Sequence, residues 1–436
     1  MKVFLSACAL LLAPLCWGQV SNGGYVIFGQ NGSVQSNNPD FDNPIRQAPN
    51  LQQSREEHQK LVQEQNRRIR ASQQPAFEQR RAAWQETQYE LLREKAAQQQ
   101  VVLAQAEASQ AVKQRYKQAL EHLKQMLEGK KPLQVKEAVF EVEKTFPGNI
   151  LPYAIYQQPI ADWVVKMKRY ALRTGQNFDH YQTRANLLCR FFADTIRLSS
   201  TQTHYPPTYD FNDPAGEKDY THFFVSKLLR TNQGQCHSMP LLFKIIADEI
   251  GVRTHLSFSP SHSFIKIQDQ KGYLYNFETT NGHFTSDKWV IASGYVKRAG
   301  IQSRIYLDTL SLRQTIVYCL NDLAQGYAAN FGYDAFTDQC AIVMDQHHPG
   351  NIWTGLLYAN SLTRQCQGAV QKAGYPPFEA MDNFPELKQL FDQRNALYAH
   401  IEQMGYLEIP PEPYADWLQS AGKETHELIK KQVTEK

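Results

Sequence analysis

The chain has little net charge and, after its first residues, no long apolar run. Its 46 lysines and arginines nearly balance 43 aspartates and glutamates, which leaves a net charge of +3 over 436 residues. This balance gives no sign of the strongly basic surface that nucleic-acid-binding proteins use, so we expect no nucleic-acid partner. Because no later segment stays apolar over the roughly 20 residues that cross a bilayer, we expect no transmembrane helix.

Cysteine is scarce, and the histidines do not fall at the spacings of a metal site. Two of the seven cysteines lie in the first residues, so five remain beyond them: Cys189, Cys236, Cys319, Cys340 and Cys366. An odd number leaves at least one thiol unpaired even where disulfides form. We predict no metal and no cofactor, because no ligand spacing with Cys or carboxylate partners is found for His204, His237, His255, His283, His347 and His348.

The first residues, MKVFLSACALLLAPLCWGQ, predict a secretory signal peptide. Lys2 precedes a short apolar run, and small residues stand near Gly18, where a signal peptidase would cut. Lipidation at Cys16 is less favoured, because Leu15 is bulky where a small residue is preferred. We therefore expect residues 1–18 to be removed and the protein to be exported, as a periplasmic or secreted protein.

Composition divides the rest of the chain into four regions. Residues 19–50 are rich in Asn, Gly and Ser, which predicts a disordered linker. Residues 51–130 are rich in Gln, Glu and Lys, which predicts long exposed helices. Residues 131–305 have a globular pattern, and residues 306–436 return to a helical pattern that resembles tetratricopeptide repeats.

The two helical regions leave alternatives open. A stripe of two heptads fits either a dimeric coiled coil or a helix lying on the protein's own next domain; it comprises Val112, Tyr116, Ala119, Leu123 and Met126. The C-terminal tail has too few repeats for a free-standing solenoid, so we expect it to pack on the core. Both regions are candidate surfaces for a protein partner, and the N-terminal helices are also a candidate pro-segment.

The segment TNQGQCHSMPLLFKIIADEIG, residues 231–251, places a cysteine at the start of a predicted helix. Its apolar residues follow a helical spacing, Pro240 fits only the first turn, and Gly251 fits a C-terminal cap. Cys236 then lies at or next to the helix N-terminus, where the positive end of the helix dipole favours the thiolate. Gly234, just upstream, is expected to give the chain flexibility there.

The segment SHSFIKIQDQKGYLYNFETTNG, which begins at Ser261, predicts a β-hairpin. A turn centred on Gln270 places two cross-strand pairs on one buried, apolar face: Ile265 opposite Tyr275, and Ile267 opposite Tyr273. This register predicts a largely apolar inner face for the hairpin.

The same register places His262 directly opposite Glu278 on the other face of the hairpin. A carboxylate beside an imidazole fixes its tautomer and stabilises the imidazolium, which in turn holds a nearby cysteine as thiolate. We therefore predict a catalytic set of Cys236, His262 and Glu278. Asn276, two residues away on the same face, is the reserve third member.

Four stretches resemble the transglutaminase-like core of the papain-type cysteine enzymes, of the exported bacterial kind: GQC at 234–236, the helix to Gly251, SHSF at 261–264 and NFETT at 276–280. The resemblance implies an α+β fold in which the helix of the catalytic cysteine packs on an antiparallel sheet. Cys236 and His262 match the family pattern, whereas Glu278 stands where an Asp is usual. Since the family includes cross-linking enzymes, peptidases, amidases and inactive members, the resemblance does not select a reaction.

The expected reaction is acyl transfer through a thioester, in which the Cys236 thiolate attacks an amide and His262 protonates the leaving amine. The expected oxyanion donors are the backbone N–H of Cys236 and a side chain, either Gln233 or Gln235. Water as acceptor makes the protein a hydrolase of protein or peptide amides, cell-wall peptides included, and we favour this reaction. A lysine amine as acceptor makes a cross-linking transglutaminase. The alternative from another class is a non-catalytic binding or scaffold protein on the same fold.

Overall fold

The structure, a computed structural model, describes residues 110–407 apart from positions 150, 214, 215, 217, 293 and 294, together with positions 86, 87 and 90. The predicted signal peptide, the linker and most of the Gln/Glu/Lys-rich region lie outside the described residues. The described part combines helices with small β-sheets and is therefore of mixed α+β class. No helix among the described residues is long and apolar enough to cross a membrane.

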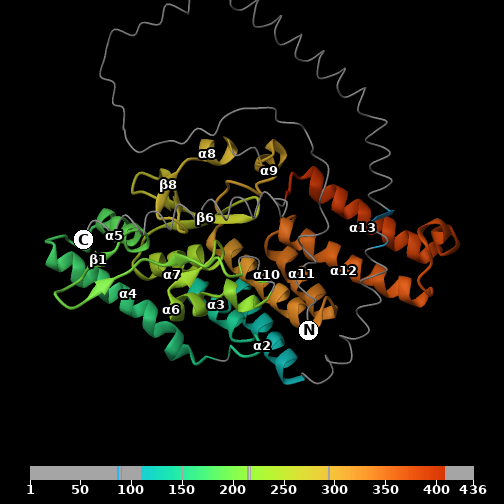
Figure 1. Cartoon of the computed structure of the whole chain (residues 1–436), viewed down its shortest axis with the longest axis horizontal. Helices are drawn as coiled ribbons and strands as arrows, with labels where there is room; N and C mark the ends of the chain where they lie inside the picture. Colours follow the sequence, from blue (N-terminus) through green and yellow to red (C-terminus); the bar gives the residue numbers. More distant parts are fainter. Residues whose placement is uncertain are drawn as a thin grey trace, which may run out of the picture. The chain divides into compact units, whose positions relative to one another are not determined.

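The elements before the candidate cysteine are mainly helical (Figure 1). The helices are α2 (Gln110–Leu127), α3 (Val135–Glu143), α4 (Tyr153–Arg173), α5 (Tyr181–Ala193), the 3-10 helix η3 (Tyr220–Phe223) and α6 (Val225–Thr231). Two short strands, β1 (Ile196–Arg197) and β2 (Thr203–His204), pair antiparallel. Two others, β3 (Thr208–Tyr209) and β4 (Gln233–Gly234), pair in parallel, and β4 lies directly upstream of Cys236.

Helix α7 (Ser238–Glu249) begins and ends where the sequence predicts. Pro240 stands at its third position, where no intrahelical N–H is required. Gly251 has φ of +68°, and Val252 N donates to Ala247 O at 2.8 Å, which together form a Schellman cap. The predicted helix after Cys236 is thus confirmed, and its apolar face is buried under the sheet.

A four-stranded antiparallel sheet with strand order β5-β6-β7-β8 follows α7; its strands are β5 (Thr254–Ser259), β6 (His262–Gln268), β7 (Leu274–Glu278) and β8 (His283–Thr285). Helix α7 packs against β5 and β6 on one side. On the other side lies α8 (Asp287–Ala292), whose Asp287 accepts hydrogen bonds from Lys266 of β6 and Asn276 of β7. Figure 1 shows the sheet between α7 and α8.

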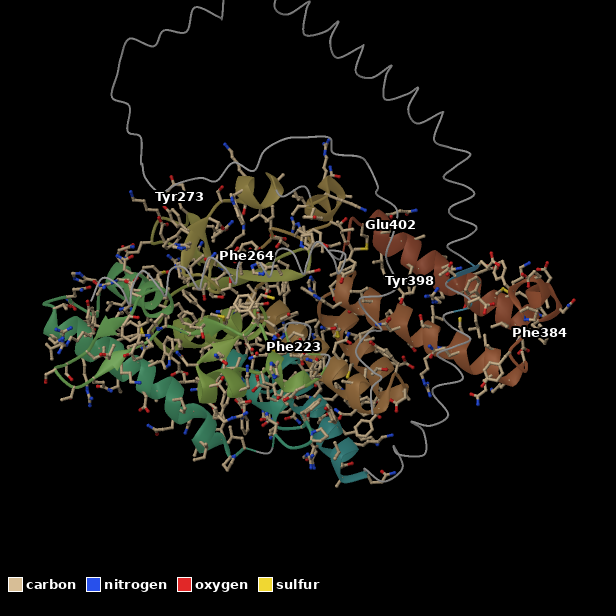
Figure 2. The ribbon with its side chains drawn as sticks, in the orientation of Figure 1. Phe223, Phe264, Tyr273, Phe384, Tyr398 and Glu402 are labelled. Carbon is tan, nitrogen blue, oxygen red and sulfur yellow. The ribbon has the colours of Figure 1, made fainter. Side chains whose placement is uncertain are left out.

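The hairpin of β6 and β7 forms as predicted, but its register is shifted by two residues. Ile265 faces Phe277 and Ile267 faces Tyr275, because a three-residue loop ends at Gly272, whose φ is +91°. A shift of two keeps each side chain on its predicted face, so Ile265 and Ile267 are buried as expected. The predicted burial of the two tyrosines is wrong, since Tyr273 and Tyr275 lie towards the end of the sheet and are exposed, as Figure 2 shows for Tyr273.

The C-terminal part is helical; it comprises α9 (Arg298–Gln302), α10 (Leu312–Phe331), α11 (Ala335–His347), α12 (Ile352–Lys372), the 3-10 helix η4 (Phe378–Asn383) and α13 (Pro385–Gln403). From α10 to α13 each helix packs on the next, and α10 also packs on α2 and α3. Asn351 caps α12 by accepting a hydrogen bond from Thr354 N at 2.9 Å. The tail therefore packs on the core, as the sequence predicts.

Helix α2 packs on the protein's own core. Tyr116, Leu123 and Met126 of its apolar stripe are buried against α3 and α10. The Tyr116 ring meets the Tyr327 ring of α10 edge to face, with centroids 5.3 Å apart. Of the two interpretations of the stripe, the structure thus supports the intramolecular one over the dimeric coiled coil.

Gly234 lies in a closely packed position, and the flexibility predicted for it stays a prediction. A Cβ at this position would lie 2.8 Å from Ser238 Oγ and 3.0 Å from Met239 Cγ. Gly234→Ala is therefore expected to lower the free energy of unfolding by about 1–3 kcal/mol through overpacking. Denaturant unfolding measures this change. Gly368→Ala in α12 is the matched control, since nothing lies within 4 Å of its added Cβ; an equal loss in the control would contradict the packing argument.

Candidate active site

Cys236 lies in the turn that leads into α7, directly before His237, the N-cap residue. Ser238 Oγ accepts a hydrogen bond from Gln235 N at 3.1 Å, and Ser263 Oγ donates one to the Cys236 carbonyl. These two hydrogen bonds tie the turn to α7 and to β6. Cys236 is half-buried, whereas the other four described cysteines are buried, so its thiol is the one that a reagent can reach most readily.

His262 begins β6 and contacts the Glu278 carboxylate at the end of β7. The distance from His262 Nε2 to Glu278 Oε2 is 2.7 Å, and the two side chains are 15% and 6% exposed. The imidazole also lies beside the Cys236 thiol and interacts with it. Because Nε2 is engaged by Glu278, Nδ1 is the ring nitrogen that can serve the thiol. The structure therefore brings together the three residues that the sequence predicts.

The observed register corrects the predicted geometry of the His–Glu pair and explains why a glutamate serves here. Extending the β6–β7 pairing places Phe264 opposite Glu278, so His262 is a diagonal rather than a direct neighbour. Diagonal neighbours on one face lie about 7–8 Å apart at their Cα atoms, which long side chains can span. The extra methylene of Glu278, compared with aspartate, supplies this reach.

The electrostatics of the site favour a thiolate–imidazolium pair. Burial alone would lower the pKa of His262, but the Glu278 carboxylate and the Cys236 thiolate raise it to about 10. Burial alone would raise the pKa of Cys236, yet the imidazoliums of His262 and His237 hold it below its usual value. The ion pair is thus favoured above the lowered pKa of the thiol and below about pH 10, where His262 stays protonated.

The turn between β5 and β6 aims a carbonyl group at the cysteine. Pro260 and Ser261 form this two-residue turn, and Ser261 has φ of +54°, a conformation that is uncommon outside glycine. The Ser261 carbonyl oxygen lies 4.0 Å from Cys236 Sγ. Backbone atoms of this turn therefore form one wall of the site, next to the Cys236 thiol.

Of the other predicted site residues, two form hydrogen bonds with partners outside the catalytic set and one is exposed. Asn276 donates to Asp287 at 2.7 Å and is paired with Lys266 in the sheet, so it is not a partner of His262, and its reserve role is wrong. Gln235 is fully buried, and its side-chain amide donates to the Asp213 carbonyl at 2.5 Å. Gln235 is therefore not placed as an oxyanion donor. Gln233 is exposed on β4 and remains a prediction for that role.

The backbone N–H of Cys236 remains a candidate oxyanion donor. Within the part of the chain that the structure describes, no group accepts a hydrogen bond from it. It stands just ahead of the N-terminus of α7, where the helix dipole favours developing negative charge.

Residues from the C-terminal helices complete the surroundings of the site. The ring of Tyr318, on α10, lies 5.6 Å from the His237 ring and 5.0 Å from the Phe258 ring of β5. Trp353 of α12 contacts both Phe258 and Tyr318, with centroids 4.9 and 5.1 Å away. Phe258 is the cross-strand partner of Ser263, so this aromatic group stands next to the turn of Cys236. It could not be located by local sequence patterns, because its members come from three distant segments.

A groove lies elsewhere on the helical region. It has a volume of about 850 Å³ and runs between α2, α12, η4 and α13. Its lining includes Lys113, Arg364, Lys372, Asp334 and Glu386, and it holds no cysteine or histidine. This groove therefore offers a surface for binding and no thiol or imidazole for catalysis.

In comparisons with known proteins, no family model, no curated protein and no solved structure matches the chain. The functional argument therefore depends on the geometry of the described residues.

Two substitutions at Glu278 separate its charge from its reach. Glu278→Gln keeps the length without the charge, and Glu278→Asp keeps the charge without the length. Each is expected to lower the pKa of His262, so the upper pH limit of the thiolate–imidazolium pair moves to lower pH. Histidine NMR titration, with the alkylation rate of Cys236 against pH, measures the shift. Glu137→Gln, which changes the carboxylate partner of His122, is the matched control; an unchanged His262 titration in both Glu278 variants would contradict the assignment.

Proposed function

We propose that this protein is an exported, thiol-dependent acyl-transfer enzyme that acts on amide bonds of proteins or peptides, with Cys236 as nucleophile, His262 as acid and base, and Glu278 as the orienting carboxylate. The observation that carries the proposal is the 2.7 Å contact of His262 with Glu278 beside the half-buried thiol of Cys236. A core of the papain and transglutaminase type, with α7 against the antiparallel sheet, is part of the proposal.

The proposed reaction proceeds in two steps through a thioester. The Cys236 thiolate attacks the amide carbonyl while its backbone N–H stabilises the oxyanion. The His262 imidazolium gives its Nδ1 proton to the leaving amine, the C–N bond breaks, and the acyl group remains on sulfur. Neutral His262 then takes a proton from water, whose oxygen attacks the thioester, and the thiolate leaves as the carboxylic acid forms. Glu278 stabilises the imidazolium in both steps.

The acceptor and the substrate can be determined in one experiment. The mature chain is incubated with a tryptic peptide mixture and a fluorescent primary amine, and the products are identified by mass spectrometry. We expect new peptide ends or deamidated glutamines, which report transfer to water; amine adducts would indicate a transglutaminase instead. Cys236→Ala is the control, and products that form equally with this variant would contradict the proposal.

A second candidate function is supported by the groove on the helical region. Its volume of about 850 Å³ and its mixed charged and apolar lining suit a bound peptide or protein segment. On this alternative the protein is a binding or scaffold protein, and Cys236 has no role. Peptide binding that survives Cys236→Ala while no product forms with the native chain would favour it.

A further inference from the structure

His237, the residue after the candidate nucleophile, is held by acceptors at both of its ring nitrogens. Nδ1 lies 3.0 Å from the carbonyl oxygen of Phe223, and Nε2 lies 3.1 Å from Asp322 Oδ1 on α10. The side chains of His237 and Asp322 are 20% and 16% exposed, so water screens the pair only partly. Figure 2 labels Phe223, the end of η3 that supplies the carbonyl.

These two contacts favour the charged form of the imidazole. The Phe223 carbonyl oxygen can only accept a hydrogen bond, so Nδ1 carries a proton, and the Asp322 carboxylate 3.1 Å from Nε2 favours a proton there as well. With both nitrogens protonated the ring is an imidazolium. This charge stands one residue from Cys236, on contacts that His262 does not share.

The groups around His237 keep it charged over a wide pH range. Burial lowers its pKa, but Asp322 and the Phe223 carbonyl raise the pKa to about 9. The ionisable groups that face it from the elements packed on it are Glu143 of α3, Tyr220 of η3, Tyr318, Cys319 and Asp322 of α10, and Cys236 itself. Burial raises the pKa of Glu143 to about 7, so this carboxyl adds negative charge only above that pH.

We propose that His237, fixed by Asp322, is a second imidazolium that stabilises the Cys236 thiolate independently of His262. His262 must lose and regain a proton in each cycle. His237 keeps its protons, because neither the Phe223 carbonyl nor the Asp322 carboxylate takes a proton from an imidazolium at neutral pH. It thus favours the thiolate as nucleophile in the first step and as leaving group in the second. His237 and Asp322 are positioning residues, since they act through Cys236. The mechanistic role rests on the proposed function.

The test measures the alkylation rate of Cys236 by iodoacetamide between pH 4 and 10 in the mature chain. His237→Gln removes the cation and keeps a hydrogen-bond donor; Asp322→Asn removes the carboxylate charge and keeps the side-chain shape. Both variants are expected to move the acid limb of the profile to higher pH and to lower the rate at pH 6 about tenfold. The double variant should show no further change, because the two residues act as one pair.

Two controls make the result decisive. His122→Gln changes another histidine with a carboxylate partner: His122 Nε2 lies 2.9 Å from Glu137 Oε1 on α3. This variant should leave the alkylation profile of Cys236 unchanged. Nitrogen-15 NMR of labelled histidines in the native chain should show His237 doubly protonated at pH 7.5, and this decides the charge even if a variant fails to fold. A neutral His237, or folded variants with an unmoved acid limb, would overturn the inference. If instead the pKa of Cys236 in the native chain is no lower than that of a free cysteine, the result contradicts the proposed function itself and not only the role of His237.

Discussion

His262→Ala is expected to lower kcat for amide cleavage or transfer about ten-thousand-fold, the largest effect of any single change apart from loss of Cys236 itself. The variant loses an imidazolium that stabilises the thiolate and, with it, the proton donor for the leaving amine. The measurement is the initial rate at pH 7 with the best substrate from the peptide mixture, compared with the native chain.

His283→Ala is the matched control for His262→Ala. His283 stands on β8 as the cross-strand partner of Glu278, and its side chain is exposed, so the variant removes a nearby imidazole without touching the proposed ion pair. Its kcat should stay within a factor of about two. Equal losses in the two variants would show that any disturbance of this sheet reduces activity, and the role assigned to His262 would be withdrawn.

Phe277→Ala is expected to lower the free energy of unfolding by about 3–5 kcal/mol. Phe277 is 1% exposed and lies between the Phe243 ring of α7, 5.3 Å away, and the Phe284 ring of β8, 5.1 Å away. Its removal leaves a cavity between the sheet and α7, the helix that follows Cys236. Denaturant unfolding followed by circular dichroism measures the change.

Phe284→Ala offers the comparison for Phe277→Ala, because the two residues face each other on neighbouring strands. Phe284 is 60% exposed, so its replacement removes an aromatic ring of equal size but leaves little buried cavity. We expect a loss of less than about 1 kcal/mol. A loss as large as that of Phe277→Ala would mean that the sheet and α7 do not form the core described above.

Local signals in the sequence were sufficient to predict α7 and the position of Cys236. Pro240 limits where the helix begins, Gly251 terminates it, and the apolar spacing between them identifies its buried face. Each of these signals acts within a few residues along the chain, so no tertiary information was needed.

The hairpin could be predicted only in part. Alternation identified the strands and the faces, and hence that His262 and Glu278 share a side of the sheet. The register depended on the loop, where Gly272 adopts a left-handed conformation and the turn centres on Lys271 instead of Gln270. A glycine at the end of DQKG was the available signal for the correct register.

His237 and Asp322 could not be paired from the sequence. The contact joins the N-cap of α7 to the middle of α10, and nothing local in either segment requires it. Metal-ligand spacing is a property of short segments, whereas the acceptors that face the two ring nitrogens of His237 come from η3 and α10.

The central claim, that Cys236 and His262 form an ion pair, is tested most directly by the pH dependence of alkylation at each cysteine, resolved by mass spectrometry, in the native chain and in His262→Ala. The account predicts that Cys236 reacts fastest, with a thiol pKa below the free value of about 8.5, and that His262→Ala raises it. The buried thiols of the other described cysteines should react slowly in both proteins. An unreactive Cys236, or a Cys236 profile that is the same with and without His262, would contradict the claim.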